Sequence, residues 1–425
     1  MLSESLWKAY IAGSGAIAHW REMAAFAALP TGERRLILTR RLWEQIQYFG
    51  RRADALPEWR EAAQIRDPLE LWWVWRTLPI VTKHDLRTRF HPEEIRRRFR
   101  LEGEISRTGG STGEPTAYLH YPAMQRATTA ARLYARRRMG WRPGMPTICV
   151  WGSERDIGGR RSLRKRISGW LRNDHLIDGY NLDGATADRV LEITNRFPQV
   201  ALYGFTSMLE FVAREVVRRG AEPAGRVAVA WNGGEVLLDT QAEIFKRAFA
   251  VPLLDLYGGR ELSAMAYQPA EGAPLKVLRP LVMVEVVEAR LIWTSTVCRG
   301  TPFLRYDIGD LGAAAEEDES GIGSIGKIQG RYAGLLRTPN GRTINCIYWN
   351  HLFKEFGEIE QFQVALRGDR SLELRFKGRP MAAGREEQLR RVLGGFLGDL
   401  PVRVRWVERI PLTPQGKHVQ VVTEP

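Results

Sequence analysis

The residues with the clearest chemical potential form a run of hydroxyl side chains and glycines at 106–115, Ser-Arg-Thr-Gly-Gly-Ser-Thr-Gly-Glu-Pro. Glycines let backbone N–H groups approach a polyphosphate closely, and serine and threonine hydroxyls donate further hydrogen bonds. The run lacks the Gly-Lys-Ser/Thr of a Walker loop. It therefore predicts a phosphate-binding loop of another kind, with an ordinary surface loop as the alternative.

A second candidate lies at 255–261, where an apolar strand leads into Tyr257, two glycines, Arg260 and the carboxylate of Glu261. At the carboxyl edge of a parallel sheet, this order would place an aromatic ring where it can stack on a base. It would also place a carboxylate beside a metal ion. Taken alone, the segment is a weak indication of a nucleotide site.

Two further candidates lie nearer the carboxyl terminus. The segment 301–310 ends in Asp310, which could accept from two ribose hydroxyls, and Arg331 in the later Gly-Arg pair could bind phosphate oxygens. A salt-bridged turn is the alternative. The segment 411–417, Pro-Leu-Thr-Pro-Gln-Gly-Lys, offers Lys417, one of only nine lysines, on a glycine-hinged tip. It could deliver one mobile positive charge, or be an ordinary solvated lysine.

The elements that must position these residues change in character along the chain. Residues 1–100 place apolar side chains at three- and four-residue intervals, which predicts a helical lead-in. Its Trp-rich stretch at 71–75 is interpreted as packing material. From residue 146, short apolar runs alternate with helical stretches. The runs predict strands at 147–150, 200–203, 227–230 and 252–256. This alternation indicates an α/β fold with largely parallel sheets flanked by helices.

After residue 255 the pattern becomes richer in strands, with a pair predicted at 282–287 and 291–296. A break near 330 separates a large domain, 1–330, from a small α+β domain, 331–425, which we expect to be mobile. Within the small domain we predict a hairpin turn at 339–341, strands at 361–366 and 371–376, and a helix over 385–397. The small domain carries 16 basic and 10 acidic residues, a net charge of +6.

Composition excludes several classes of protein. The 425 residues are 44% hydrophobic and 26% charged, as in an ordinary globular protein of two or three domains. No stretch is long and apolar enough to span a membrane, and no leader is apparent, so a cytoplasmic location is expected. Three widely spaced cysteines offer neither a disulfide framework nor a four-thiolate zinc site.

The net charge of +14 would fit a nucleic acid as partner, as would the arginine-rich run at 160–166. The run has no interleaved aromatic residues and is more typical of a solvated helix or loop. Because all but nine of the 63 basic residues are arginines, a genomic composition bias explains the charge as well. We therefore expect no nucleic-acid partner.

The four candidate segments together, in this order and spacing, resemble the adenylate-forming enzymes. This superfamily contains acyl- and aryl-CoA synthetases, luciferase-like enzymes and peptide-synthetase adenylation domains. The similarity covers about residues 100–420 and is strongest to the phenylacetate–CoA ligase branch, with its capsule-biosynthesis relatives. It implies ATP-dependent activation of a carboxylic acid to an acyl-adenylate, then transfer to a thiol.

The resemblance also implies roles for individual residues. Lys417 would bridge the carboxylate and the α-phosphate during adenylation, and Arg331 would act at the hinge. Glu261 would hold Mg²⁺ with ATP, and an acyl pocket would be lined by Tyr203, Gly204 and Phe205. The implied ATP-binding residues are Thr108, Gly109, Gly110, Ser111, Thr112, Gly113, Gly233, Gly234, Glu235, Tyr257, Gly258 and Asp310.

Two departures from the family pattern affect these expectations. Ala333 and Gly334 follow the hinge where carboxylates are common, which bears on the second half-reaction. Thr116 stands where many members have a lysine after the loop proline, which leaves phosphate neutralisation to Mg²⁺ and Lys417.

The expected acid is aryl or otherwise bulky. The expected acceptor is coenzyme A or the phosphopantetheine of an acidic carrier protein, and a homodimer is allowed. An amine acceptor, AMP transfer or a non-catalytic nucleotide-binding role are the alternatives.

Overall fold

The computed structural model divides the chain into two compact units. The first comprises 1–108, 115–308 and 312–328, and the second comprises 109–114, 309–311 and 329–425. The structure describes the following residues: 15–107, 116–151, 173–179, 182–222, 226–331, 336–337, 343–344, 349, 352–353, 356–369, 371–397, 400–411 and 418–424. The lead-in residues 1–14, the predicted phosphate loop at 108–115, the basic run at 160–166 and Lys417 lie outside this set.

The first unit begins with a series of helices, in agreement with the predicted helical lead-in. The helices are α2 Ile17–Ala28, α3 Thr31–Gly50, α4 Pro57–Ala62, α5 Pro68–Val74, η1 Trp75–Thr77, α6 Lys83–Thr88 and α7 Pro92–Arg98. Side-chain caps start two of the short ones, because Asp67 accepts from Leu69 N at 2.9 Å and Thr82 forms a capping box with Asp85.

The interpretation of the Trp-rich stretch as packing material is wrong for one residue. Trp72 and Trp75 are buried, but Trp73 is 70% exposed. The helical period of α5 directs Trp73 away from the core, where the guanidinium of Arg35 lies 5.2 Å from its ring centroid.

A nine-stranded sheet follows, in the order β13-β14-β9-β8-β7-β6-β5-β3-β4. Its parallel half contains β3 Thr147–Trp151, β4 Asp174–Asp178, β5 Val200–Gly204, β6 Val227–Asn232 and β7 Leu253–Gly259. Its antiparallel half contains β8 Ser263–Tyr267, β9 Leu275–Val277, β13 Ala314–Asp318 and β14 Gly321–Ile325. The four strands predicted from apolar runs are β3, β5, β6 and β7, whereas β4 was not predicted. The antiparallel half joins it through β7, so the sheet is mixed rather than mostly parallel.

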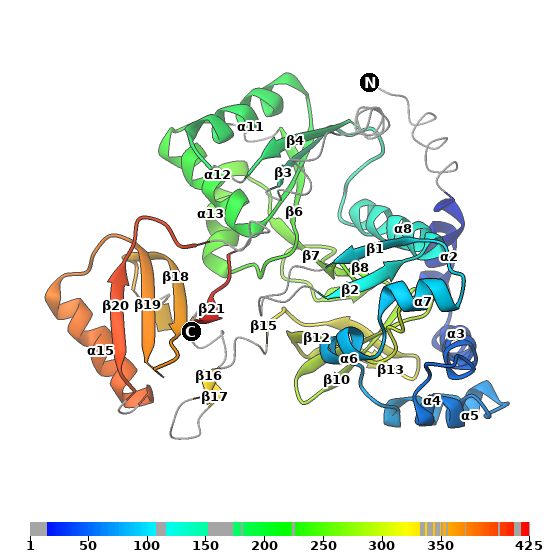
Figure 1. Ribbon diagram of the computed structural model, residues 1–425. Helices are drawn as coiled ribbons and strands as arrows, with labels where there is room; N and C mark the ends of the chain where they lie inside the picture. Colours follow the sequence, from blue (N-terminus) through cyan, green and yellow to red (C-terminus); the bar gives the residue numbers. More distant parts are fainter. Residues whose placement is uncertain are drawn as a thin grey trace. The chain divides into compact units, whose positions relative to one another are not determined.

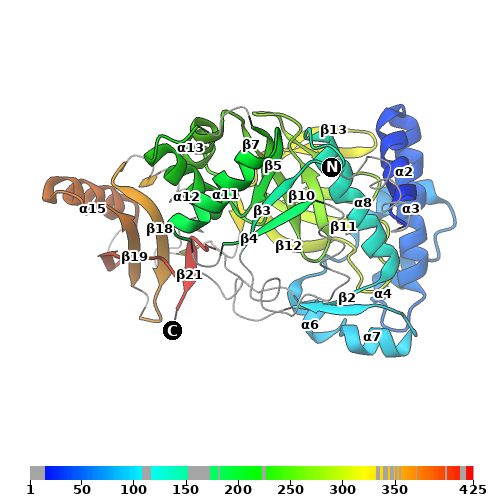
Figure 2. The ribbon, with the colours of Figure 1, turned by 90° about the horizontal axis from the view of Figure 1, so that it is seen from above.

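Alternate side chains of the parallel strands enter two different cores. Leu202 and Ala230 pack with helices α11 Gly184–Arg196, α12 Thr206–Arg218 and α13 Asp239–Phe249. Their neighbours Ala201, Val229 and Trp231 pack into the core that contains α8 Pro122–Arg138. Figures 1 and 2 show α11, α12 and α13 together on one side of these strands and α8 on the other. This two-sided burial explains the nearly continuous apolar runs of the sequence.

A second sheet contains the predicted strand pair at 282–287 and 291–296. Its order is β10-β11-β12-β15, with β10 Val282–Val287, β11 Arg290–Ser295, β12 Tyr306–Leu311 and β15 Gly330–Arg331. The segment before α6 joins it as an isolated parallel bridge between Val81 and Tyr306. There Val81 N donates to the carbonyl oxygen of Arg305 at 3.0 Å, and Asp307 N donates to that of Val81 at 2.8 Å.

The second unit is an α+β structure. Its four-stranded sheet has the order β20-β19-β18-β21, with β18 Ile359–Leu366, β19 Leu372–Gly378, β20 Val402–Trp406 and β21 Val421–Thr423, and α15 Ala383–Leu397 packs on it. The short strands β16 Leu336–Arg337 and β17 Thr343–Ile344 pair antiparallel on either side of the predicted hairpin turn at 339–341, which lies outside the described residues. The predicted strands and helix of this region are thus confirmed to within two residues.

Among the described residues, no helix has the length and hydropathy needed to cross a membrane. Another described feature is the buried cysteine Cys298, a free thiol. Burial raises the pKa of the Cys298 thiol to about 12. This thiol therefore stays protonated and unreactive at neutral pH.

Candidate active site

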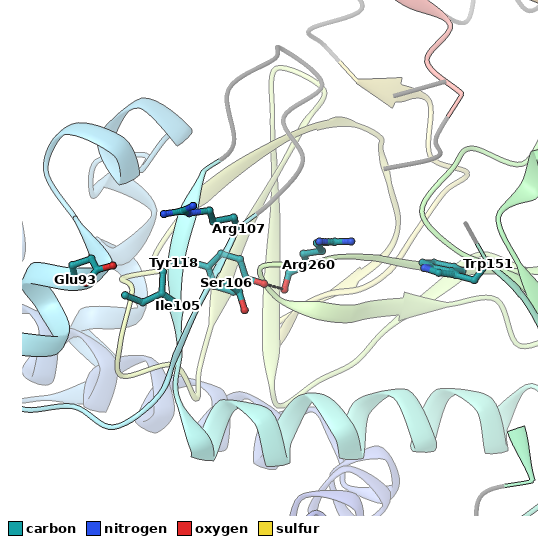
Figure 3. A pocket seen from close by; sticks show the side chains of 7 residues that line it. All are labelled: Glu93, Ile105, Ser106, Arg107, Tyr118, Trp151 and Arg260. Carbon is teal, nitrogen blue, oxygen red and sulfur yellow. Dashed lines mark hydrogen bonds between the residues drawn. The ribbon is translucent and has the colours of Figure 1, made fainter. Parts of the chain in front are cut away.

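A pocket of about 630 Å³ lies in the first unit, beside the hairpin formed by β1 Glu104–Arg107 and β2 Ala117–His120. It extends to the carboxyl ends of β3 and β7, which is the edge of a parallel sheet where ligands commonly bind. Figure 3 shows the lining residues: Glu93, Ile105, Ser106, Arg107, Tyr118, Trp151 and Arg260. The pocket therefore joins the strand before the predicted phosphate loop with the Tyr257–Glu261 segment.

The turn after β7 is held in place by a close approach of two backbones. A Cβ atom at Gly258 would lie only 2.0 Å from the carbonyl oxygen of Ser263, so this position requires glycine. The β7–β8 register shifts between Tyr257 and Gly258. This irregularity ends the regular strand and lets Arg260 and Glu261 leave it at the edge of the pocket.

Tyr118 fixes the backbone of that turn. Its hydroxyl donates to the carbonyl oxygen of Arg260 at 2.5 Å, and its ring is buried. Burial, with the negative charge of Glu261, raises the pKa of Tyr118 above its usual value. The hydroxyl therefore remains a protonated donor at neutral pH, and the Arg260 backbone stays anchored while its side chain reaches the pocket (Figure 3).

Glu261 is a buried carboxylate with little to neutralise it. It accepts a hydrogen bond from the Tyr306 hydroxyl at 3.3 Å, and only 5% of its surface is exposed. In the described part of the chain, no lysine, arginine or histidine lies within ion-pair distance of it, and no group of three candidate metal ligands occurs. A buried carboxylate with one neutral donor is suited to a cation that takes its other ligands from water and phosphate.

Aromatic rings stand side by side at the carboxyl ends of β3, β5 and β6. Tyr203 stacks between Trp151, at 5.2 Å, and Trp231, at 5.6 Å, and Trp151 also stacks on Phe205 at 3.9 Å. Gly204 permits this arrangement, since a Cβ atom there would lie 2.5 Å from the carbonyl oxygen of Val150. We call Trp151, Tyr203, Phe205 and Trp231 the aromatic row; its member Trp151 lines the pocket.

The segment 233–235 continues directly from β6 and lies next to the row. Gly233 N donates to the carbonyl oxygen of Gly204 at 3.0 Å. The Glu235 carboxylate accepts from Ser207 N at 2.8 Å and from its hydroxyl at 3.1 Å, at the start of α12. The structure thus gives Glu235 a helix-capping contact, and brings the predicted ATP-binding residues 233–235 beside the predicted acyl pocket.

The remaining predicted residues lie in different surroundings. Tyr257 is buried, with its ring tilted against Trp293 at 5.7 Å. In the second unit, Asp310 of β12 is the antiparallel partner of Arg331 in β15, and Asp310 is buried. The predicted residues Thr108 to Gly113 and Lys417 fall outside the described part of the chain.

Sequence reasoning missed Arg260, Tyr118, Trp151 and Trp231. A usable signal existed for two of them. Trp151 directly follows a predicted strand at the same sheet edge as Tyr203, and Arg260 stands inside the 255–261 segment, next to Glu261. Tyr118 could be found only through its hydrogen bond to a residue 142 positions away.

Comparison with known proteins gives the fold. No protein-family model matches the chain. It aligns with the crystal structure of 2-hydroxyisobutyryl-CoA ligase in the postadenylation state, in complex with R3-HIB-AMP. The TM-score is 0.66 at 17% identity, covering 93% of this chain and 90% of the ligase. The chain has the fold of the adenylate-forming ligases.

Two other structures with this fold align less extensively. ATP-bound MatB from Rhodopseudomonas palustris has a TM-score of 0.54 at 16% identity, covering 73% of this chain and 65% of MatB. The anthranilate CoA ligase AuaEII, in complex with anthranoyl-AMP, has a TM-score of 0.52 at 13% identity, covering 74% of this chain and 65% of AuaEII.

In sequence, the chain is 25% identical over 248 residues to protein CapK of Staphylococcus aureus. The match covers 55% of this chain and 52% of CapK. The matched region thus spans about half the length of that curated relative.

Proposed function

We propose that this protein uses ATP to convert a carboxylic acid into an acyl-adenylate and then transfers the acyl group to a thiol. One observation carries the proposal. The pocket at the carboxyl edge of the parallel sheet combines two arginines that have no carboxylate partner among the described residues, a neighbouring buried carboxylate and an aromatic wall. Phosphate, divalent cation and organic acid are the three components that adenylation brings together. The ligase fold supports the same conclusion.

The chemistry explains why cations are needed. A carboxylate oxygen attacks the α-phosphorus of ATP, a P–O bond to the β-phosphate breaks, and pyrophosphate leaves with the electron pair. Negative charge grows on the α-phosphate in the transition state, so positioned positive groups lower the barrier. Lys417 would supply one of them from the carboxyl-terminal segment, with Thr108 to Gly113 holding the phosphates, Asp310 the ribose and Arg331 acting at the hinge.

Glu261 fits the requirement for a magnesium-linked carboxylate. Its burial, its single neutral donor and the absence of a basic partner among the described residues leave its charge available to a cation. Mg²⁺ commonly binds through one or two carboxylates plus substrate phosphates, and when bound it would neutralise phosphate oxygens. Tyr306 holds the Glu261 side chain in orientation.

The aromatic row supports an aryl or similarly flat acid. Trp151 presents its indole to the pocket, and the rings behind it hold it in place. Offset stacking of a substrate ring on such a surface contributes about 0.5–1.5 kcal/mol beyond area burial. An alkyl acid would lose this contribution.

The acceptor would be the thiol of coenzyme A or of a carrier protein. The thiolate attacks the acyl carbon, the carbon–oxygen bond to AMP breaks, and AMP leaves. The small domain carries a net charge of +6, which would attract an acidic carrier protein in a salt-dependent manner. Thioester formation with each acceptor across a range of ionic strength distinguishes the two. Efficient, salt-insensitive transfer to coenzyme A alone would reject the carrier protein.

The deciding experiment is acid-dependent exchange of pyrophosphate into ATP, over a panel of aryl and alkyl acids. We expect exchange with at least one acid, and a loss of several orders of magnitude in Lys417→Ala with ATP binding retained. Lys377→Ala, which changes a lysine in β19, is the matched control. Asp310→Ala should instead weaken ATP binding.

The outcomes separate the alternatives. ATP binding with no exchange for any acid would favour a non-catalytic nucleotide-binding role. Exchange without thioester formation would favour an amine acceptor or AMP transfer. Wild-type exchange in Lys417→Ala would reject the role of that lysine.

A further inference from the structure

We propose that Arg136 is a specificity-determining residue, which selects acids that carry a second oxygen acceptor in addition to the carboxylate that is activated. Arg136 was not among the residues implied by the family resemblance. The inference rests on the proposed function for the statement that the ligand is a carboxylic acid. The role of Arg136 itself is argued from its contacts, burial and charge.

Arg136 lies against the aromatic row, on the side of the sheet that α8 covers. It belongs to the last turn of α8, where Trp141 N donates to its carbonyl oxygen at 2.9 Å. Its guanidinium carbon lies 5.4 Å from the ring centroid of Tyr203 and 5.2 Å from that of Trp231. The helix end thus holds a cation against two rings of the row.

The charge of Arg136 has no counter-ion. The side chain is half-buried, and in the described part of the chain no carboxylate lies within ion-pair distance of it. Its own helix offers none, because α8 contains five arginines and no acidic residue. Contact with ring faces offsets part of the hydration that the guanidinium loses, but it supplies no acceptor atom. The positive charge is therefore available to an oxygen acceptor.

Two buried donors at this place also lack an acceptor. Arg136 Nε and Trp231 Nε1 are inaccessible to solvent, and neither has a hydrogen-bond partner in the region that the structure describes. Buried polar groups are nearly always paired in folded proteins. Arg305 shows the usual arrangement, since its Nε donates to Glu285 at 2.9 Å. Within the chain, Arg136 is neither neutralised nor fully hydrogen-bonded, which points to an acceptor from a ligand.

The aromatic row connects this charge to the pocket. Trp151 lines the pocket (Figure 3), and the Tyr203 ring lies 5.2 Å behind it, with Arg136 on the same Tyr203 ring. One ring therefore separates the pocket wall from the charge. Tyr203 and Arg136 are both partly exposed, so this part of the row is accessible.

A hydroxyl or carboxylate on a flat acid is the group that this placement fits. Arginine binds carboxylate oxygens through its planar fork of donors, and a hydroxyl oxygen can accept from the same donors. An unsubstituted ring would stack on the row and leave the charge without an acceptor. A site built to bind a polar group discriminates strongly against an analogue that lacks it. Arg136 would thus narrow the substrate class from aryl acids to aryl acids with a second oxygen group.

The test compares acids that differ by one substituent, in titration calorimetry of the full chain with and without a non-hydrolysable ATP analogue. The probes are benzoate, phenylacetate and their meta- and para-hydroxy and meta- and para-carboxy derivatives. The variants are Arg136→Met and Arg136→Lys. Arg137→Met, which changes the exposed neighbour in the same helix, is the matched control. Circular dichroism and thermal unfolding verify that each variant is folded.

For the wild type, we expect at least one derivative to bind about 10- to 100-fold more tightly than its parent acid, because it gains a charge-assisted hydrogen bond. Arg136→Met should bring this ratio of affinities close to one. Arg136→Lys should keep part of the ratio by keeping the charge, and Arg137→Met should keep all of it. The KM for each acid in pyrophosphate exchange should follow the same ratio.

Several results would overturn this role of Arg136. They are a wild type that binds none of the acids, equal affinity for parents and derivatives, a wild-type ratio in Arg136→Met, or a loss of ATP affinity as large as the loss for the acids. The proposed function is judged separately. A ratio that depends on Arg136, without acid-dependent exchange, would reject the proposed function and support the subsite. Exchange with parents and derivatives alike would do the opposite.

Discussion

Arginine side chains have opposite environments in the second sheet and in the pocket wall. In the second sheet, Arg305 is buried and its Nε donates to Glu285 at 2.9 Å, while Arg290 pairs with the buried Asp307 at 2.9 Å. In the pocket wall, Arg260 and Arg107 have no carboxylate partner among the described residues. The same residue type thus serves to satisfy buried charge in one region and leaves charge available for a ligand in the other.

The difference has an energetic basis. A buried ion pair must hold both partners, because removal of one leaves an uncompensated charge in the interior. A solvent-accessible guanidinium has no such constraint, so its loss should affect binding and leave folding intact. Stability and ligand affinity should therefore respond to different arginines.

The largest effect is expected for Arg305→Met. This change leaves Glu285 buried without its partner and removes a contact to the Leu78 carbonyl oxygen. We expect a loss of about 3–5 kcal/mol in the free energy of unfolding, measured by urea titration. The double variant Arg305→Met, Glu285→Met should recover part of it. A loss below about 1 kcal/mol in the single variant would contradict the structural role.

Asp255, a buried carboxyl group, should make the free energy of unfolding fall as the pH rises. Burial raises the pKa of Asp255 to about 7, with Lys327 lowering it in part, and Asn232 can donate to Asp255 Oδ1 at 3.0 Å. Because the folded state holds this proton more tightly than the unfolded state, the contribution of Asp255 to stability is greatest below pH 4. It should fall as the pH rises toward 7, by on the order of 4 kcal/mol.

Asp255→Asn tests this by removing the titration. The variant should match the wild type near pH 4 and exceed it in stability near pH 8, in unfolding curves measured across that range. A parallel pH dependence in the variant and the wild type would contradict the assignment to Asp255.

Loss of an exposed ion pair should lower the free energy of unfolding far less than loss of a buried one. Lys246 and Glu271 lie 2.8 Å apart, and both side chains are more than half exposed. We expect Lys246→Ala to change the free energy of unfolding by about 0.5 kcal/mol or less, with the difference shrinking in high salt. A loss comparable to that of Arg305→Met would show that burial does not set the difference in energy between ion pairs of this chain.

The smallest change in stability is expected for Arg260→Met. Its side chain contributes no described ion pair, and the Tyr118 hydrogen bond goes to its backbone. We expect the free energy of unfolding to stay within about 0.5 kcal/mol of the wild type. A large loss, with normal ATP affinity, would move Arg260 into the same class as Arg305.

This contrast also shows where sequence reasoning stops. The strands β3, β5, β6 and β7 were predictable, because two-sided burial leaves long apolar runs. The roles of arginines were not. Arg305 stands inside the 301–310 segment, yet its partner Glu285 lies in β10, and only the strand order brings the two together. A local sequence pattern cannot reveal a partner residue that lies in another strand of the sheet.

The candidate site divides in the same way. Tyr203 and Phe205 were predicted from a family resemblance, and Glu261 from the local pattern at 255–261 as well. The structure brings Tyr203 and Phe205 into contact with Trp151. The antiparallel half of the large sheet was not predicted, because its strands are short and one, β13, is exposed throughout. Exposed edge strands carry little hydrophobic signal.

The bridge between Val81 and Tyr306 has a consequence for synthesis of the chain. The two residues are 225 positions apart, and the hydrogen bonds of Val81 go to Arg305 and Asp307. At about 5–20 residues per second, the ribosome would deliver Tyr306 roughly 10–45 s after Val81. Part of the apolar surface of the helices around Val81 therefore stays uncovered until the second sheet has left the ribosome. During that interval the nascent chain is a natural client for chaperones.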